Sequence, residues 1–110
     1  MASQQNAVLQ EMQERVESLL NARDLTNLLA YLKAQHPADI ADMLEFLDEP
    51  QRVEIFQLLQ ADVAAEVLDE TLTEITRELV EAMPSYQVAD LLEALPTDDA
   101  AEVLSELDER

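Results

Sequence analysis

The 110 residues suffice for one domain with a modest hydrophobic core, and 48% of them are apolar. The chain has no glycine and no cysteine, which excludes glycine-rich phosphate loops, disulfides, thiolate catalysis and cysteine-based zinc sites. Its formal net charge of −19 disfavours nucleic acid and anionic membrane surfaces as partners, because both are themselves negatively charged.

The first 36 residues predict a pair of helices. Residues 4–20 are expected to form an amphipathic helix, because their apolar side chains recur every three or four positions. This apolar stripe consists of Val8, Met12, Val16, Leu19 and Leu20. Ser3 is a candidate N-cap of the first helix, and Asp24 is a candidate N-cap of the second. The apolar residues of the second helix are Leu25, Leu28, Leu29 and Leu32.

An acidic residue then recurs every twelve positions through the rest of the chain. The six members of this series are Asp42, Glu54, Glu66, Glu78, Asp90 and Glu102. A second position, five residues after each acid, is apolar in five of the six copies: Leu47, Leu59, Thr71, Met83, Leu95 and Leu107. A unit of twelve residues holds about nine helical residues, roughly 13 Å of helix, and a turn of two to three residues. Helices this short are marginal alone, so the repeat predicts an all-α stack of short helices.

Prolines and hydroxyl residues mark the same period. Pro37 and Pro50 fit the first turn of a helix, where the missing N–H is not needed. Thr73, Ser85 and Thr97 share one repeat position and are the expected N-caps of their helices. No linker interrupts the pattern, so we expect one domain, made of an N-terminal helical pair (1–36) and a repeat region (37–110).

Several residue types are expected to serve packing alone. Methionines on the apolar stripes should lie in the core, phenylalanines should pack, and small alanines should let helices approach closely. These residues are Met12, Met43, Met83, Phe46, Phe56, Ala41, Ala65, Ala89 and Ala101.

No catalytic arrangement is visible in the sequence. The single histidine, His36, precedes Pro37 and is expected to flank a helix start. The hydroxyl residues are explained as caps or surface positions, so a nucleophile–base pair has no framework. Paired carboxylates for glycoside chemistry would need sugar-stacking aromatic residues, which are scarce here. The sequence therefore favours an interaction or sensing module over an enzyme.

The negative charge is concentrated in the repeat region. Residues 1–36 carry four acids and three bases, whereas residues 37–108 carry twenty acids and only two bases, a net of −18. Some acids form helical ladders, namely Asp98–Glu102–Glu106 with Asp99 beside it, Glu74–Glu78–Glu81, and Asp39–Asp42–Glu45. Like charges at this spacing are mildly destabilising until a cation neutralises them, and hard divalent cations prefer oxygen ligands. Acidic helix starts are thus candidate weak, water-accessible Mg²⁺ sites, although spacing alone selects none of them.

Two segments resemble a known family. The segment from His36 to Leu44 reads HPADIADML, and the segment from Leu95 to Leu104 reads LPTDDAAEVL. Together with the segments LDEPQR (47–52) and AAEVLDE (64–70) between them, they resemble the cytosolic N domain of MgtE-type magnesium channels, over roughly residues 5–108.

The resemblance implies a right-handed superhelix of short helices, followed in the full-length homodimeric protein by paired CBS domains and a transmembrane pore. It implies a regulatory domain at the cytoplasmic side of the bacterial inner membrane, soluble when isolated and not inserted in the bilayer. There, Mg²⁺ bound between the N and CBS domains would favour the closed pore. Asp98 and Glu102 become the best candidate metal ligands, with Asp99 as an auxiliary, and the CBS domains would supply the rest.

A second interpretation needs no metal. A helical-repeat adaptor, similar to the flagellar-motor switch domain that resembles MgtE N domains in shape, would dock a basic protein on its acidic face. Substitution of Asp98 and Glu102 separates the two interpretations: a sensor would lose its Mg²⁺ response, and an adaptor would lose a salt-sensitive partner.

Overall fold

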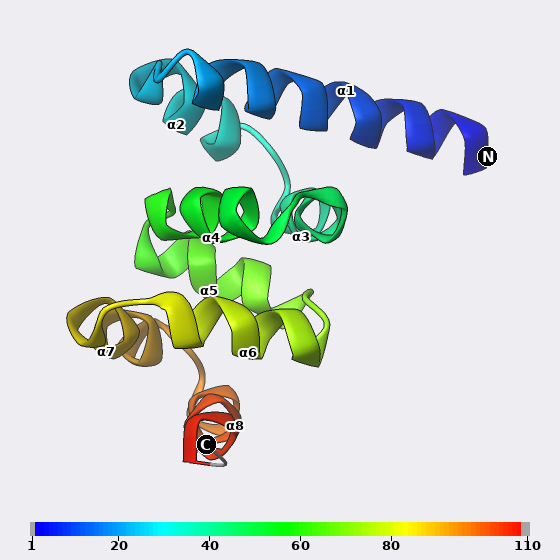
Figure 1. Ribbon diagram of the computed structural model, residues 1–110. Coiled ribbons are helices and arrows are strands. Elements are labelled where there is room, and N and C mark those ends of the chain that lie inside the picture. Colours follow the sequence, from blue (N-terminus) through cyan, green and yellow to red (C-terminus); the bar gives the residue numbers. More distant parts are fainter. Residues whose placement is uncertain (1, 109–110) are drawn as a thin grey trace.

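The computed structural model describes residues 2–108, with side chains described for residues 7–105, and its regular elements in that range are all α-helices (Figure 1). In chain order they are α1 (Ala2–Asn21), α2 (Leu25–Lys33), α3 (Pro37–Phe46), α4 (Glu49–Leu58), α5 (Ala61–Asp69), α6 (Thr73–Ala82), α7 (Ser85–Ala94) and α8 (Thr97–Asp108). The prediction of an all-α helical-repeat fold is confirmed, with turns of two or three residues between the repeat helices. None of the described helices is long and apolar enough to cross a membrane.

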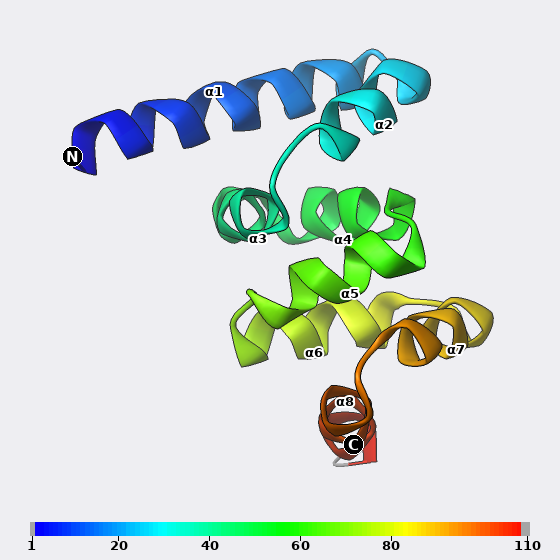
Figure 2. The ribbon, with the colours of Figure 1, turned by 180° about the vertical axis from the view of Figure 1, so that it is seen from behind.

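From α3 onwards, each helix packs on the helix two places further along the chain. α3 packs on α5 and α5 on α7, while α4 packs on α6 and α6 on α8. The helices therefore form an odd and an even column, stacked between α1 at one end and α8 at the other (Figure 1 and Figure 2). α1 continues the odd column by packing on α3, and α2 packs on α1. The right-handedness of the superhelix stays a prediction.

Most residues of the predicted apolar stripes form one continuous core, but Val8 and Leu25 are 56% and 40% exposed and lie outside it. Ile40, Met43 and Leu44 of α3 are fully buried, as expected. In α7, by contrast, Leu91 is buried whereas Val88 is only half-buried. The core is thus thickest in the middle of the stack and thinner towards its C-terminal end.

The expected role of the alanines holds for only half of them. Ala41 and Ala65 are buried, but Ala89 and Ala101 are exposed. The last two lie on α7 and α8, which end the stack, so no further layer within the described residues covers them.

The expected packing role also fails for one aromatic residue. Phe56 is buried, but Phe46 is 59% exposed. Phe46 is the last residue of α3 and lies roughly 120° around the helix from the centre of the buried face. Its backbone carbonyl contacts α1 by accepting a hydrogen bond from the side-chain amide of Gln13 at 3.5 Å.

The turns of the repeat are part of the core. Leu47, Leu59, Met83 and Leu95 directly follow a helix, have extended backbones with ψ between 143° and 155°, and are at most 9% exposed. This conformation ends the helix at once and directs the side chain between layers. It also suits Met83 and Leu95 because a residue before proline avoids the helical region. The apolar position that recurs in the sequence is therefore the buried turn residue.

Of the predicted N-caps, Asp24 is confirmed. Its carboxylate accepts a hydrogen bond from the backbone N–H of Asn27 at 3.4 Å. His36 occupies the N-cap position of α3 without a side-chain cap bond, in agreement with its expected flanking role. The prediction for Ser3 is wrong, because α1 begins at Ala2 and already includes this residue.

The predictions of Thr73, Ser85 and Thr97 as N-caps are wrong. These residues are already the first residues of α6, α7 and α8. For α6 and α7 the N-cap positions belong to Leu72 and Pro84, which are extended and make no side-chain cap bond. A hydroxyl one residue later lies inside the first turn, where it does not take the capping position.

Because the chain has no glycine, side chains of other helices bind several of the terminal helix carbonyls. Gln57 of α4 donates to the carbonyl of Ala82 at 3.0 Å, and Gln87 of α7 donates to the carbonyl of Gln57 at 2.8 Å. The first of these amide caps joins α4 to α6 within the even column, and the second joins α7 of the odd column to α4.

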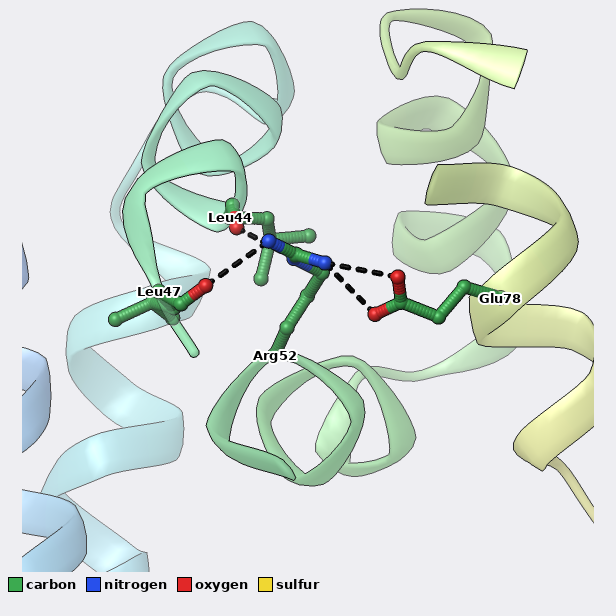
Figure 3. A network of polar contacts seen from close by, with 4 residues as sticks. All are labelled: Leu44, Leu47, Arg52 and Glu78. Carbon is green, nitrogen blue, oxygen red and sulfur yellow. Dashed lines mark hydrogen bonds and ion pairs between the residues drawn. The ribbon is translucent and has the colours of Figure 1, made fainter. Parts of the chain in front are cut away.

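Arg52 makes the most extensive of these caps (Figure 3). Its Nε donates to the carbonyl of Leu44 at 2.7 Å, and its Nη2 donates to the carbonyl of Leu47 at 2.9 Å. Its Nη1 donates to both carboxylate oxygens of Glu78, at 2.7 and 3.0 Å. The Arg52 side chain is 13% exposed. One guanidinium on α4 thus binds the end of α3 and holds α6, and Glu78 is not the unpaired rung of an acidic ladder that the sequence indicated.

Replacing Arg52 by methionine is expected to lower the free energy of unfolding by about 2–4 kcal/mol, because two carbonyls lose their donor and Glu78 loses its counter-charge. Arg52→Lys keeps the charge without the planar fork and should recover only part of this loss. Urea denaturation followed by circular dichroism measures both variants. If Arg52→Lys were as stable as the parent, charge alone would explain the contact.

α1 ends differently from the repeat helices. Arg23 has φ 57°, in the left-handed region, and the N–H groups of Arg23 and Asp24 bind the carbonyls of Leu20 and Leu19, both at 3.0 Å. This is a Schellman cap, whose left-handed position is usually glycine. The Arg23 side chain forms an exposed ion pair with Glu54.

Arg23→Gly is expected to be more stable than Arg23→Ala by about 1 kcal/mol, because a left-handed backbone penalises any Cβ. Both variants lose the pair with Glu54, so their difference reports the backbone alone. Thermal and urea unfolding measure it, and equal stabilities would mean that this position carries no strain.

Candidate cation-binding site

The regular turn is interrupted once, between α5 and α6. Here the turn has three residues, and the C-cap of α5, Glu70, has φ −103° and ψ 3° instead of an extended backbone. Thr71 takes the place of the buried apolar turn residue, and its hydroxyl donates to the carbonyl of Val67 at 2.6 Å. A polar position is thereby introduced where other copies are apolar.

A polar hollow of about 140 Å³ lies at this interruption, between the α5–α6 turn and α8. Three carboxylates and three hydroxyl residues line it: Asp69, Asp99, Glu102, Thr71, Thr73 and Thr76. Leu68, Leu95 and Val103 form its apolar part. Asp69 and Asp99 also line a neighbouring hollow together with Asp62 and Glu66. Among the described residues, none of those that line the two hollows is basic, so this is a region of concentrated negative charge.

The structure separates the three predicted ligands. Asp99 and Glu102 line the same hollow, Asp99 half-buried and Glu102 exposed, whereas Asp98 is exposed and lines neither of these two hollows. Asp98 and Asp99 both lie in the first turn of α8, where negative charge suits the helix dipole. Glu106, the last rung of the ladder, lies outside the described side chains.

Sequence reasoning missed Asp69. This residue belongs to α5 and meets α8 across the hollow, which no helical spacing reveals. One signal was present in the sequence, namely Thr71, the single polar residue at the recurring apolar position.

The donor set suits a hard cation but does not form a complete cage. Carboxylate and hydroxyl oxygens are the ligands that Mg²⁺ prefers, and Mg²⁺ usually keeps several waters. Among the described residues, however, no group of three or more His, Cys, Asp or Glu side chains is arranged to hold a metal ion. The residues present fit a partial, water-rich site.

The profile of the MgtE intracellular N domain family matches residues 35–110, more than half of the chain. The chain belongs to this family. Its membership indicates an intracellular domain of a magnesium transporter, in agreement with the resemblance seen in the sequence. Comparison with curated proteins gave no match. The match begins just before α3, so the matched part of this MgtE N domain includes the hollow, whereas α1 and α2 lie before it.

Two single substitutions test the geometry of the hollow at low ionic strength. Glu102→Gln should raise the free energy of unfolding by a few tenths of a kcal/mol, since it removes one of the carboxylates that share the hollow. Asp98→Asn should lower it slightly, since it removes a favourable dipole interaction without relieving the hollow. Both effects should fade in about 1 M NaCl. Thermal melting distinguishes the signs, and the same sign for both would contradict this arrangement.

Proposed function

We propose that this MgtE N domain is the Mg²⁺-sensing regulatory part of a magnesium channel or transporter, acting from the cytoplasmic side of the membrane. The observation that carries the proposal is the gathering of Asp69, Asp99 and Glu102 around one hollow, within the part of the chain that matches the family.

Charge supports the same proposal. Residues 37–108 carry a net charge of −18, and the acids of the two hollows lie together without a basic residue in either lining. A partial oxygen site of this kind would bind Mg²⁺ weakly on its own. It would bind more strongly if a second acidic surface, that of the CBS domains of the same polypeptide, supplied the missing ligands.

The mechanism follows from mutual repulsion. Two acidic domain surfaces repel each other, and bound Mg²⁺ neutralises them, so Mg²⁺ binds the compact arrangement better than the open one. Such differential binding shifts the population towards the compact state, which would favour the closed pore of the homodimeric channel.

The test compares thermal melting of the domain in MgCl₂ and in NaCl at matched ionic strength. Mg²⁺ is expected to raise the melting temperature more than Na⁺ does, though weakly, because only part of the site is present. The double variant Asp99→Asn/Glu102→Gln should lose this difference, because both carboxylates line the hollow.

The matched control is Asp90→Asn/Glu93→Gln, which removes two exposed carboxylates from α7 and leaves the hollow unchanged. The control should keep the Mg²⁺ response. Equal stabilisation by MgCl₂ and NaCl, or an equal loss in both double variants, would reduce the effect to general screening and favour an adaptor that binds a basic partner.

A further inference from the structure

The hollow beside Glu102 occupies the position in the repeat that corresponds to the Arg52 contact, 24 residues earlier in the chain. We call two consecutive twelve-residue units a double unit. Two columns of twelve-residue units make positions that are 24 residues apart equivalent. The four residues of the Arg52 contact are Leu44, Leu47, Arg52 and Glu78 (Figure 3). Their equivalents 24 residues later are Leu68, Thr71, Thr76 and Glu102. All four equivalents line the polar hollow.

One backbone hydrogen bond is common to the two places, although the α5–α6 turn is one residue longer than the α3–α4 turn. The N–H of Leu47 bonds to the carbonyl of Leu44 at 3.3 Å, and the N–H of Thr71 bonds to the carbonyl of Leu68 at 3.1 Å. α4 packs on α6 as α6 packs on α8, so the carboxylate on the next helix of the same column is also in an equivalent place. The three acceptors that bind the guanidinium of Arg52 therefore have counterparts around the hollow, namely the carbonyls of Leu68 and Thr71 and the carboxylate of Glu102.

The residue that differs is the donor. Thr76 stands at the position of Arg52 and is too short to reach across to the carboxylate. It is 8% exposed and is the single buried polar residue among the described side chains. The recurring site is also more acidic, because Asp99 replaces the equivalent Ile75.

We propose that this hollow is a guanidinium site, filled by an arginine side chain that a partner protein segment supplies. The carbonyls of Leu68 and Thr71 and the carboxylate of Glu102 would accept the planar fork as their equivalents accept Arg52. Lysine fits less well, because its ammonium is a point charge without the fixed fork. This site does not depend on Mg²⁺ sensing, although Mg²⁺ and the arginine would compete for Glu102.

Methylguanidinium is the probe, with methylammonium as its control, in buffer that contains EDTA. Amide shifts in NMR spectra of the whole chain should change at Leu68, Thr71, Thr76 and Glu102. Methylguanidinium should bind at least about 5-fold more tightly than methylammonium. Glu102→Gln should weaken this binding, whereas Asp90→Asn, at the same repeat position on α7, should not.

Thr76→Arg should fill the site from within the chain, raise the melting temperature and lower the affinity for methylguanidinium at least about tenfold. Ala101→Arg adds the same charge at an exposed position of α8 and should do neither. Methylguanidinium should also restore part of the stability lost in Arg52→Ala, which tests the equivalence even if Thr76→Arg fails to fold.

The proposal would be overturned if the two cations bound with equal affinity, or if Glu102→Gln and Asp90→Asn weakened methylguanidinium binding equally. Either result would mean that the cations are attracted only by the general negative charge of the surface. Absence of shifts at the hollow would overturn it as well. Because the titration excludes Mg²⁺, a negative result would not affect the proposed Mg²⁺ response of the domain. Likewise, the absence of a Mg²⁺ response in thermal melting would not affect the guanidinium site.

Discussion

The short length of the helices is the constraint on which the structure depends. The repeat helices have nine to twelve residues, about 14–18 Å, and such helices do not persist alone in water. α3, α4, α6 and α7 are each held because the residue that ends the helix is extended and buried, as Leu47 and Leu59 show. The same buried turns reverse the chain after every unit and thereby sort the helices into two columns.

The columns give one scaffold two different uses. In the first double unit, Arg52 neutralises Glu78 and ties α3, α4 and α6 together. In the second, a short threonine replaces the arginine, and Glu102 faces a hollow that it shares with Asp99. The negative charge that is balanced in the middle of the stack is therefore concentrated near its end. A structural ion pair and a candidate binding site arise from the same arrangement of backbone and carboxylate.

Periodicity predicted the fold because the apolar stripes and the turn residues are local features. Ile40, Met43 and Leu44 could be placed in the core from spacing alone, and they are buried. The caps at Thr73 and Ser85 were misplaced by one residue, because an extended turn occupies the N-cap position that a hydroxyl usually takes. Local reasoning thus determined the helices more reliably than their ends.

The candidate site was predicted less completely than the fold. Asp99 and Glu102 were candidates because the resemblance to the family implied metal ligands in the segment that holds them, whereas Asp69 reaches the hollow from another helix, for which it implied none. The pairing of Arg52 with Glu78 was missed for the same reason, since it joins residues 26 positions apart within one column. Contacts between columns and layers depend on the register of the stack, which one sequence without its structure does not specify.

The packing of each helix on the next but one restricts how such a chain can change length. Inserting or deleting a single twelve-residue unit would transfer every later helix to the opposite column. If the change fell between α4 and α6, Arg52 and Glu78 would lie in different columns, and their ion pair would be lost. Loss or gain of two units at once would keep every partner in place. Viable length variants of this architecture should therefore differ by whole pairs of helices.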